Sequence, residues 1–265
     1  MAETNKHYDI SAEFFQAFLD PYMKYTSGLY HQNETLEEGI LNMLNKHVSF
    51  LQGSTNPAIL EVGPGWGSFI KRLSEVKKDF TYTAINPSLV QNTYIQTQIQ
   101  PDAIIHEGCF ETADSLAPNS FDIIYFIGSF CHMTQKENQL EKLYSLLKPG
   151  GRVIIEDTFF ITKDLFTKHA FRSETSFVQK EVFGFAEILA LPEFLETVPQ
   201  KGFQMVSLLE HSSSYARTID FWLGKLADIQ SPEKVQFIQY LKIAQKGWNR
   251  TIANYLIELR KMGPQ

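Results

Sequence analysis

Hydrophobic positions along this chain gather in short runs that are separated by longer stretches with helical spacing. The short runs, which are typical of buried strands, occupy residues 59–62, 80–85, 103–106, 121–127 and 152–156. The stretches in which apolar residues recur every three or four positions occupy residues 69–76, residues 135–147 and a segment that begins at Ser88. Strands that alternate with helices predict an α/β fold with a parallel, doubly wound sheet.

The N-terminal part of the chain is predicted to be helical. Residues 14–19 carry a phenylalanine-rich stripe, and the helix that it predicts must end before Pro21. Residues 35–50 show the same spacing and predict a second helix. We therefore expect residues 1–52 to form an N-terminal helical cap.

The C-terminal part is predicted to contain one more strand and two helices. Residues 203–209 predict a late edge strand, and residues 215–229 and 232–260 predict two long helices. The second helix would carry an apolar stripe of Phe237, Leu241, Trp248, Ile252, Tyr255 and Leu259. Core packing explains such stripes more often than a dimer contact does, so the sequence leaves the oligomeric state open.

Residues 157–200 fit the alternation of strands and helices poorly. The segment is rich in phenylalanine, with Phe159, Phe160, Phe166, Phe171, Phe177, Phe183 and Phe185. Two interpretations stay open: a lid that covers a substrate at the ligand-binding end of the sheet, and a structural flap that buries these rings. We expect one domain over residues 1–265 with a lid insertion at 157–200.

Composition and charge exclude several classes of protein. The chain has 265 residues, 43% of them hydrophobic, and a net charge of −6, which argues against a nucleic-acid-binding surface. The longest apolar stretch, at residues 121–130, is too short to span a bilayer, and no signal peptide is visible. Cys109 and Cys131 have no metal-ligand spacing. We expect a cytoplasmic protein without a metal or an integral membrane segment.

The glycine-rich stretch at residues 59–69, ILEVGPGWGSF, is the most informative in the chain. Gly63, Gly65 and Gly67 stand at alternate positions between a strand and a helix, where backbone N–H groups are free to bind a ligand. This G-x-G-x-G spacing differs from the dinucleotide and P-loop patterns. The preceding Glu61 suits a ligand with an ammonium group. The stretch is similar to the S-adenosylmethionine (SAM) loop of class I methyltransferases; the alternative is an ordinary strand–turn–helix junction.

Further motifs resemble the cyclopropane-fatty-acid synthase family, which includes the mycolic acid cyclopropane synthases. They are HYDISAEFFQAFLDP (7–21), MKYTSGLY (23–30), ETLEEGI (34–40), LLKPGG (146–151), FVQKEVF (177–183) and YARTIDFW (215–222). The resemblance covers nearly the whole chain. It implies a seven-stranded Rossmann-like methyltransferase sheet with N-terminal helices, an inserted lid and SAM as cofactor.

The same resemblance implies a set of cofactor contacts. They are Tyr25 and Thr26 from the N-terminal segment, Glu61, Gly63 and Gly65 at the methionine part, Asn86 and Gln91 at the ribose, Cys109 and Phe110 at the adenine, and Ile127 and Gly128 at the methionine chain. Asn86 stands where most class I methyltransferases have an acidic residue. Its amide can still bind a ribose hydroxyl, although without the assistance of a charge.

The chain departs from the family at the groups that hold a bicarbonate base. Ser27, Cys131 and Glu156 replace a cysteine, a glutamate and a histidine, whereas His132 and Tyr215 are retained. A carboxylate at Glu156 would repel an anion, so we expect that bicarbonate does not bind. Glu156, His132 and Tyr215 are thus the candidate catalytic residues, with Glu156 as base or acceptor-orienting carboxylate unless the reaction needs none.

Structural alternatives exist for two of these residues. Glu156 could pair with a neighbouring cation, with Asp157 solvated beside it, and His132 could be a satisfied structural histidine. The leading functional hypothesis is methyl transfer from SAM to carbon or nitrogen of a small, largely apolar acceptor. A carboxylate and an aromatic lid would suit an amine. The alternatives are cyclopropanation of unsaturated lipid chains and SAM binding without turnover.

Overall fold

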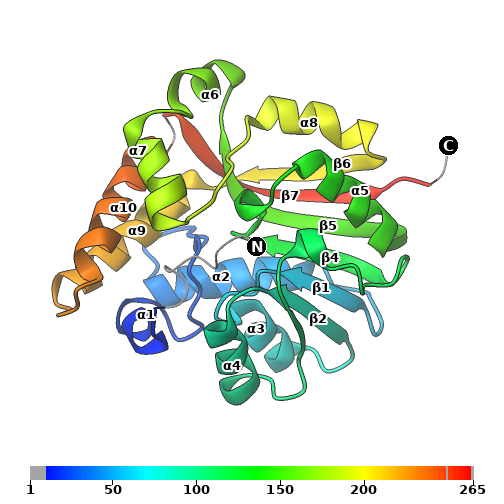
Figure 1. Cartoon of the computed structure of the whole chain (residues 1–265). Helices are drawn as coiled ribbons and strands as arrows, with labels where there is room; N and C mark the ends of the chain where they lie inside the picture. Colours follow the sequence, from blue (N-terminus) through cyan, green and yellow to red (C-terminus); the bar gives the residue numbers. More distant parts are fainter. Residues whose placement is uncertain (1–9, 249, 264–265) are drawn as a thin grey trace.

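The computed structural model describes residues 10–248 and 250–263, and these build a seven-stranded sheet in the order β3-β2-β1-β4-β5-β7-β6 (Figure 1). The strands are β1 (Ala58–Val62), β2 (Thr81–Asn86), β3 (Ile104–Glu107), β4 (Phe121–Ile127), β5 (Leu147–Phe160), β6 (Phe203–Glu210) and β7 (Ile252–Lys261). The strands β1 to β5 pair in parallel. The predicted α/β fold and the predicted edge strand β6 are confirmed.

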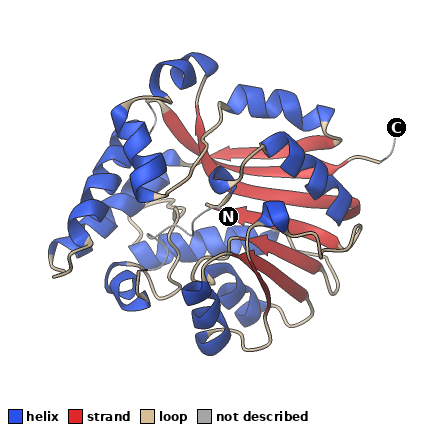
Figure 2. Ribbon diagram, in the orientation of Figure 1, coloured by secondary structure: helices blue, strands red, loops and turns tan. Residues whose placement is uncertain are grey.

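Helices cover both faces of this sheet (Figure 2). They are α1 (Ala12–Phe18), α2 (Leu36–Ser49), α3 (Ser68–Val76), α4 (Leu89–Gln98), α5 (Lys136–Leu146), α6 (Lys163–His169), α7 (Ser173–Ser176), α8 (Leu191–Gln200), α9 (Ser212–Ala227) and α10 (Lys234–Gly247). The two predicted N-terminal helices correspond to α1 and α2. Residues 1–9, with the start of the predicted cap and of the 7–21 motif, lie outside the described residues.

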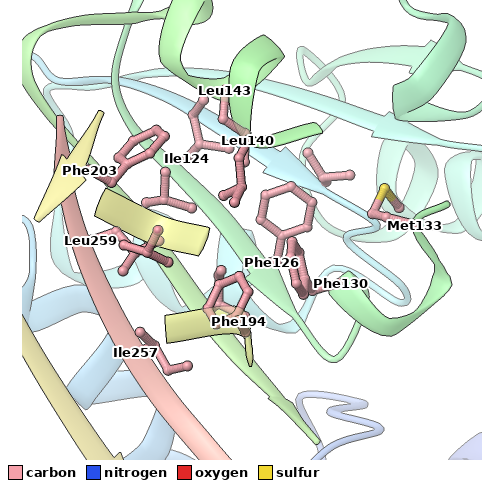
Figure 3. Packing of buried hydrophobic residues seen from close by; sticks show 14 of the residues in the cluster. Ile124, Phe126, Phe130, Met133, Leu140, Leu143, Phe194, Phe203, Ile257 and Leu259 are labelled. Carbon is pink, nitrogen blue, oxygen red and sulfur yellow. The ribbon is translucent and has the colours of Figure 1, made fainter. Parts of the chain in front are cut away.

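Successive strand residues point to opposite faces of the sheet, and each face has its own core. On one face, Ile124 and Phe126 of β4 pack with residues of α5 and α8, among them Leu140 and Phe194 (Figure 3). On the other face, Tyr125 packs with residues of α2, α3 and α4. A third cluster joins α1, α9 and α10 beside the glycine loop. The parallel strands therefore end between these helices.

The second C-terminal helix predicted over residues 232–260 is wrong beyond Gly247. Residues 252–261 instead form β7, which runs antiparallel between β5 and β6. Residues 253–259 are buried without alternation, because β7 lies inside the sheet and both of its faces are covered. A fully buried strand has no period of two, so its apolar residues also fitted a helical stripe. The sheet is mixed rather than wholly parallel.

The segment predicted as a lid begins with strand. β5 continues to Phe160, beyond the end predicted at residue 156, and α8 packs against the sheet core. Between them lie α6, α7 and a π-helix, η4 (Phe177–Val182). Phe159 and Phe160 are buried, whereas Phe171 is 87% exposed, so only part of the aromatic content serves core packing. A lid function for this segment stays a prediction.

Candidate active site

The glycine loop between β1 and α3 has the backbone that its sequence requires. Gly63, Gly65 and Gly67 have φ angles of +70°, +55° and +79°, which residues with a Cβ rarely adopt. A Cβ at Gly63 would lie 2.6 Å from the Cβ of Ser129, whereas a Cβ at Gly65 would meet no atom within 4 Å. The loop is thus packed on one side and open at Gly65, which fits a ligand that lies against its backbone.

Glu61 stands at the end of β1, directly before the loop. It is 1% exposed and accepts a 2.6 Å hydrogen bond from the Tyr82 hydroxyl. Burial raises the pKa of Glu61 to about 7, because the carboxylate loses its hydration. An ammonium group of a ligand would stabilise the charged carboxylate, so this residue fits the methionine end of SAM.

Neutral amide side chains gather where β2 ends and α4 begins. Asn86 Nδ2 donates to Asn92 Oδ1 at 2.9 Å and to Gln91 Oε1 at 3.2 Å, and all three side chains are buried. The predicted ribose residues Asn86 and Gln91 therefore lie together. After β3, Cys109 is half-buried, and the Phe110 ring packs edge-on against Phe126 at 5.9 Å. Core packing thus accounts for the Phe110 ring.

A cavity of about 350 Å³ lies at the carboxyl ends of β4 and β5. Five residues predicted for the site line it: Tyr25, Thr26, Gly128, His132 and Tyr215. Its wall contains the aromatic rings of Phe160, Phe183, Tyr240 and Trp248 beside the charged residues Arg172, Glu174 and Lys246, and Tyr215 stacks on Trp248 at 4.7 Å. Other lining residues come from the segments 169–188 and 243–254. Ile127, also predicted, is buried in the core beside Gly128.

Asp157 is a carboxylate in the wall of this cavity. It is 4% exposed, so the part of the structural alternative that left Asp157 solvated is wrong. Its two oxygens accept hydrogen bonds from the backbone N–H groups of Cys131, at 2.9 Å, and Thr158, at 2.7 Å. Burial nevertheless raises the pKa of Asp157. The side chain thus presents a desolvated carboxylate to whatever fills the cavity.

His132 lies close enough to Asp157 for their charges to interact. Burial lowers the pKa of His132, and Asp157 opposes that shift. His132 Nδ1 lies 2.8 Å from the carbonyl oxygen of Phe185. Because a carbonyl only accepts, Nδ1 carries the hydrogen, and Nε2 is the basic nitrogen of the neutral ring. The pair can therefore hold a proton near the cavity.

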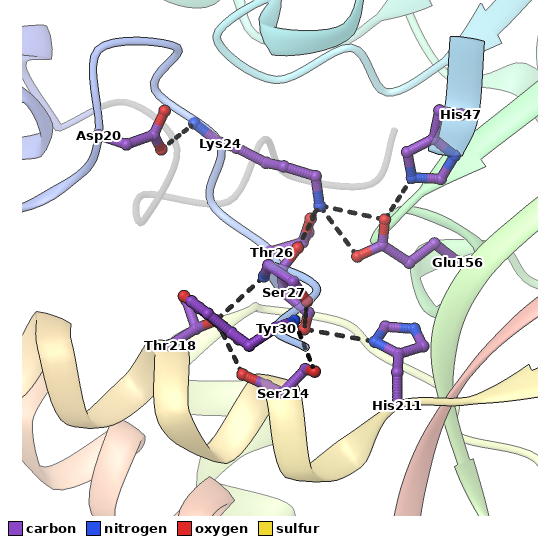
Figure 4. Close-up of polar contacts among 11 residues, drawn as sticks. Asp20, Lys24, Thr26, Ser27, Tyr30, His47, Glu156, His211, Ser214 and Thr218 are labelled. Atoms are coloured by element: carbon purple, nitrogen blue, oxygen red, sulfur yellow. Dashed lines mark hydrogen bonds and ion pairs between the residues drawn. The ribbon is translucent and has the colours of Figure 1, made fainter. Parts of the chain in front are cut away.

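Glu156 is not among the residues that line the cavity. Its carboxylate is directed toward Lys24 and His47 (Figure 4). Its carboxylate accepts hydrogen bonds from Lys24 Nζ, at 3.0 and 3.1 Å, and lies 2.6 Å from His47 Nε2. Burial by itself would raise the pKa of Glu156, but Lys24 and His47 outweigh it and hold that pKa well below its usual range. A carboxylate with so low a pKa is a poor base. This geometry agrees with the ion-pair alternative.

Sequence reasoning missed three residues around Glu156, namely Lys24, His47 and His211. His211 Nδ1 lies 3.3 Å from Ser27 Oγ, which places Ser27 in the same polar cluster. The available signal was Lys24, which precedes the predicted cofactor residues Tyr25 and Thr26. A lysine that is buried at such a site needs a carboxylate partner. Its partner lies 132 positions along the chain, and no local pattern connects the two.

Two further findings concern the described part of the chain. Its helices include none with the length and apolarity required to cross a bilayer. The described residues also contain no group of three or more His, Cys, Asp or Glu side chains that could hold a metal ion.

The sheet order, the glycine loop and the adjoining cavity are those of an α/β methyltransferase. A family model described as mycolic acid cyclopropane synthetase matches residues 1–254, and the chain belongs to this family. Cyclopropane mycolic acid synthase 3 of Mycobacterium tuberculosis (strain CDC 1551 / Oshkosh) is 26% identical over 235 residues, which cover 83% of this chain and 80% of that protein. The chain is thus a SAM-dependent enzyme of the transferase class.

Solved structures show the same fold. The cyclopropane synthase MmaA2 from Mycobacterium tuberculosis superposes with a TM-score of 0.85 at 23% identity, over 97% of both chains. The mycolic acid cyclopropane synthase CmaA1, complexed with SAH and CTAB, gives 0.85 at 22% identity, over 98% of both chains. Coclaurine N-methyltransferase, bound to N-methylheliamine and SAH, gives 0.77 at 20% identity, over 96% of this chain and 80% of that chain.

Proposed function

We propose that this enzyme transfers a methyl group from SAM to nitrogen or carbon of a small, largely apolar acceptor that binds in the cavity of about 350 Å³. One observation carries this proposal. Tyr25, Thr26 and Gly128, which the resemblance assigns to the cofactor, line the same cavity as the aromatic side chains that would contact the acceptor. Cofactor and acceptor would thus share one enclosed space. Methyl transfer depends mainly on proximity and orientation in such a space.

Each part of the site has a role in this proposal. SAM, when bound, supplies a methyl group activated by its sulfonium. Glu61, Gly63 and Gly65 would hold the methionine part, and Asn86 with Gln91 the ribose. Tyr215 and Trp248 would orient the acceptor and exclude water. His132 Nε2 would take the proton that a protonated amine must lose before its nitrogen can attack the methyl group of SAM, with Asp157 stabilising the resulting imidazolium.

The buried Asp157 favours nitrogen as the methylated atom. A carboxylate in an aromatic cavity attracts a protonated amine through its charge, and the rings add cation–π attraction. Among similar structures, coclaurine N-methyltransferase and a putative sarcosine dimethylglycine methyltransferase from Galdieria sulphuraria have amine chemistry in their names. Glu156, which is ion-paired outside the cavity, has no part in this step.

Cyclopropanation of an unsaturated lipid chain is the second candidate, and family membership favours it. That reaction must remove a proton from the added methyl carbon. The carboxylate of Glu156 occupies the aligned position of a group that holds the family's bicarbonate, and Lys24 and His47 already neutralise it. This arrangement supports simple methyl transfer.

The experiment is an incubation of the full-length protein with methyl-deuterated SAM and a cell extract split into lipid and aqueous fractions. Simple transfer retains every deuterium of the methyl group, whereas cyclopropanation loses one. Asp157→Asn should raise KM for an amine acceptor by roughly tenfold, because one charge interaction is removed. A lipid product that lacks one deuterium would overturn the proposal, and SAM binding without product would favour a binding protein.

A further inference from the structure

Lys24 and Glu156 form an ion pair that is almost completely excluded from water. Their side chains are 1% and 0% exposed, and Lys24 Nζ lies 3.0 Å from Glu156 Oε1 (Figure 4). Breaking such a pair by changing one partner leaves a buried charge without compensation. Each member of the pair therefore compensates the buried charge of the other.

This ion pair lies directly behind one wall of the cavity. Lys24 Nζ also donates to Thr26 Oγ1 and, at 2.8 Å, to the carbonyl oxygen of Ser27. The backbone carbonyl of Glu156 accepts from the N–H of Gly128 at 2.7 Å. Thr26 and Gly128 line the cavity, so each member of the ion pair is one hydrogen bond away from a wall residue.

Other contacts hold the same N-terminal segment in place. Gly28 N–H donates to Thr218 Oγ1 at 3.0 Å, and Tyr30 N–H donates to Ser214 Oγ at 3.2 Å, both on α9. Replacing the ion pair by two neutral amides therefore leaves the segment anchored. The charge of the pair can thus be changed separately from the position of the wall.

The ligand expected on this wall is itself a cation at the reacting atom. SAM carries a positive sulfonium, and its product S-adenosylhomocysteine (SAH) carries a neutral sulfur at the same place. A buried ammonium acts over a longer distance than an exposed one, because little water screens it. An unpaired Lys24 would thus repel SAM and leave SAH almost unaffected.

We propose that Glu156 is a charge-compensating residue that neutralises Lys24 behind the cavity wall and thereby sets the relative affinity of the site for SAM and SAH. This inference rests on the SAM site of the proposed function, but not on the identity of the acceptor. Lys24 and Glu156 act on the ligand only through the charge behind the wall and do not take part in the chemical step.

The test compares three variants by calorimetric titration of the full-length protein with SAM and with SAH separately, in the absence of an acceptor. Glu156→Gln leaves the ammonium unpaired, and Lys24→Gln/Glu156→Gln removes both charges. Glu258→Gln is the matched control, because it removes a carboxylate from an ion pair with Arg152 on the same sheet, outside the cavity wall. Titration at about pH 6 helps to keep the freed ammonium protonated. Circular dichroism checks that each variant folds.

We expect Glu156→Gln to weaken SAM binding roughly tenfold relative to SAH, and the double variant to return the ratio to that of the unchanged protein. Glu258→Gln should leave the ratio unaltered. Equal losses of SAM and SAH in Glu156→Gln would overturn the proposal. If Glu156→Gln does not fold, the double variant still tests the proposal. A ratio of SAM to SAH affinity in the double variant that differs from that of the unchanged protein would overturn it. Unchanged protein that binds neither ligand would contradict the cofactor site itself.

Discussion

Thr26 and Gly128 are packed so closely that position 128 has no room for a side chain. A Cβ at Gly128 would lie 2.3 Å from Thr26 Cγ2, and the φ angle of Gly128 is +71°. We expect Gly128→Ala to lower the free energy of unfolding by about 2–4 kcal/mol, from left-handed backbone strain and overpacking together. It should also weaken SAM binding, because Thr26 must move. Urea denaturation and calorimetry measure the two effects.

Gly150→Ala is the matched control for that variant. Gly150 has a similar φ of +73°, but a Cβ there would meet no atom within 4 Å. It should cost only the backbone strain, about 1–2 kcal/mol, and leave SAM affinity unchanged. Equal effects of both alanines would mean that the contact with Thr26 is unimportant.

If Glu61 binds the ammonium group of SAM, as proposed, its raised pKa should make SAM binding dependent on pH. In the absence of ligand, burial raises its pKa from 4.5 to about 7, so a cationic ligand must displace a proton from it below that pH. SAM affinity should rise by up to tenfold per pH unit and level off above about pH 7. Glu61→Gln should flatten this dependence. A profile that is the same in both proteins would place the ammonium group elsewhere.

The same shift predicts the effect of Glu61 on stability. The folded protein without ligand binds this proton more tightly than the unfolded chain, whose carboxyl keeps a pKa near 4.5. The stabilising contribution of this proton is therefore complete below pH 4.5 and is lost as the pH rises through about 7. Thermal unfolding of Glu61→Gln, compared with unchanged protein across this range, measures the contribution.

His132→Gln should lower kcat/KM for an amine acceptor by roughly 10²–10⁴-fold, the usual effect of losing a general base. Because burial lowers the pKa of His132, the acid limb of the rate profile should lie below pH 6.5. SAM affinity should not change. His169→Gln, at a half-buried histidine of the same cavity, is the control. An unaltered rate profile in His132→Gln would indicate that His132 is structural.

Asn86→Asp should destabilise the protein, although an acidic residue is usual at this position in class I methyltransferases. Asn86 Nδ2 donates to the oxygens of Asn92 and Gln91, and a carboxylate there would face both oxygens. We expect a loss of about 1–3 kcal/mol in urea denaturation, the usual cost of an unsatisfied buried polar group. Asn45→Asp, whose oxygen accepts from Arg72 at the surface, should change stability little. Full stability of Asn86→Asp would show that the amides can reorient.

The sequence predicted the cofactor half of the fold well, because local rules decide it. The glycines of the loop are required by backbone conformation at their own positions, and the parallel strands are short apolar runs between recognisable turns. The fully buried β7 escaped prediction, since it carries no alternation and its burial comes from β5 and β6 on either side.

The candidate site was predictable only as far as single residues define it. His132 and Tyr215 line the cavity, as a role at the acceptor requires, but Glu156 faces the opposite side of β5 from Asp157. Which of two adjacent carboxylates enters the cavity depends on the strand register. The partner of Glu156, Lys24, is known only from the tertiary structure.

The position of β7 also has a consequence for how the sheet assembles during folding. Among the described strands it is the last to be synthesised, yet it lies between β5 and β6 and pairs with both. Until it arrives, those two strands have unpaired edges that face each other across a gap. The sheet can therefore close only when segments distant in sequence meet, and contacts of this kind are the ones that slow folding.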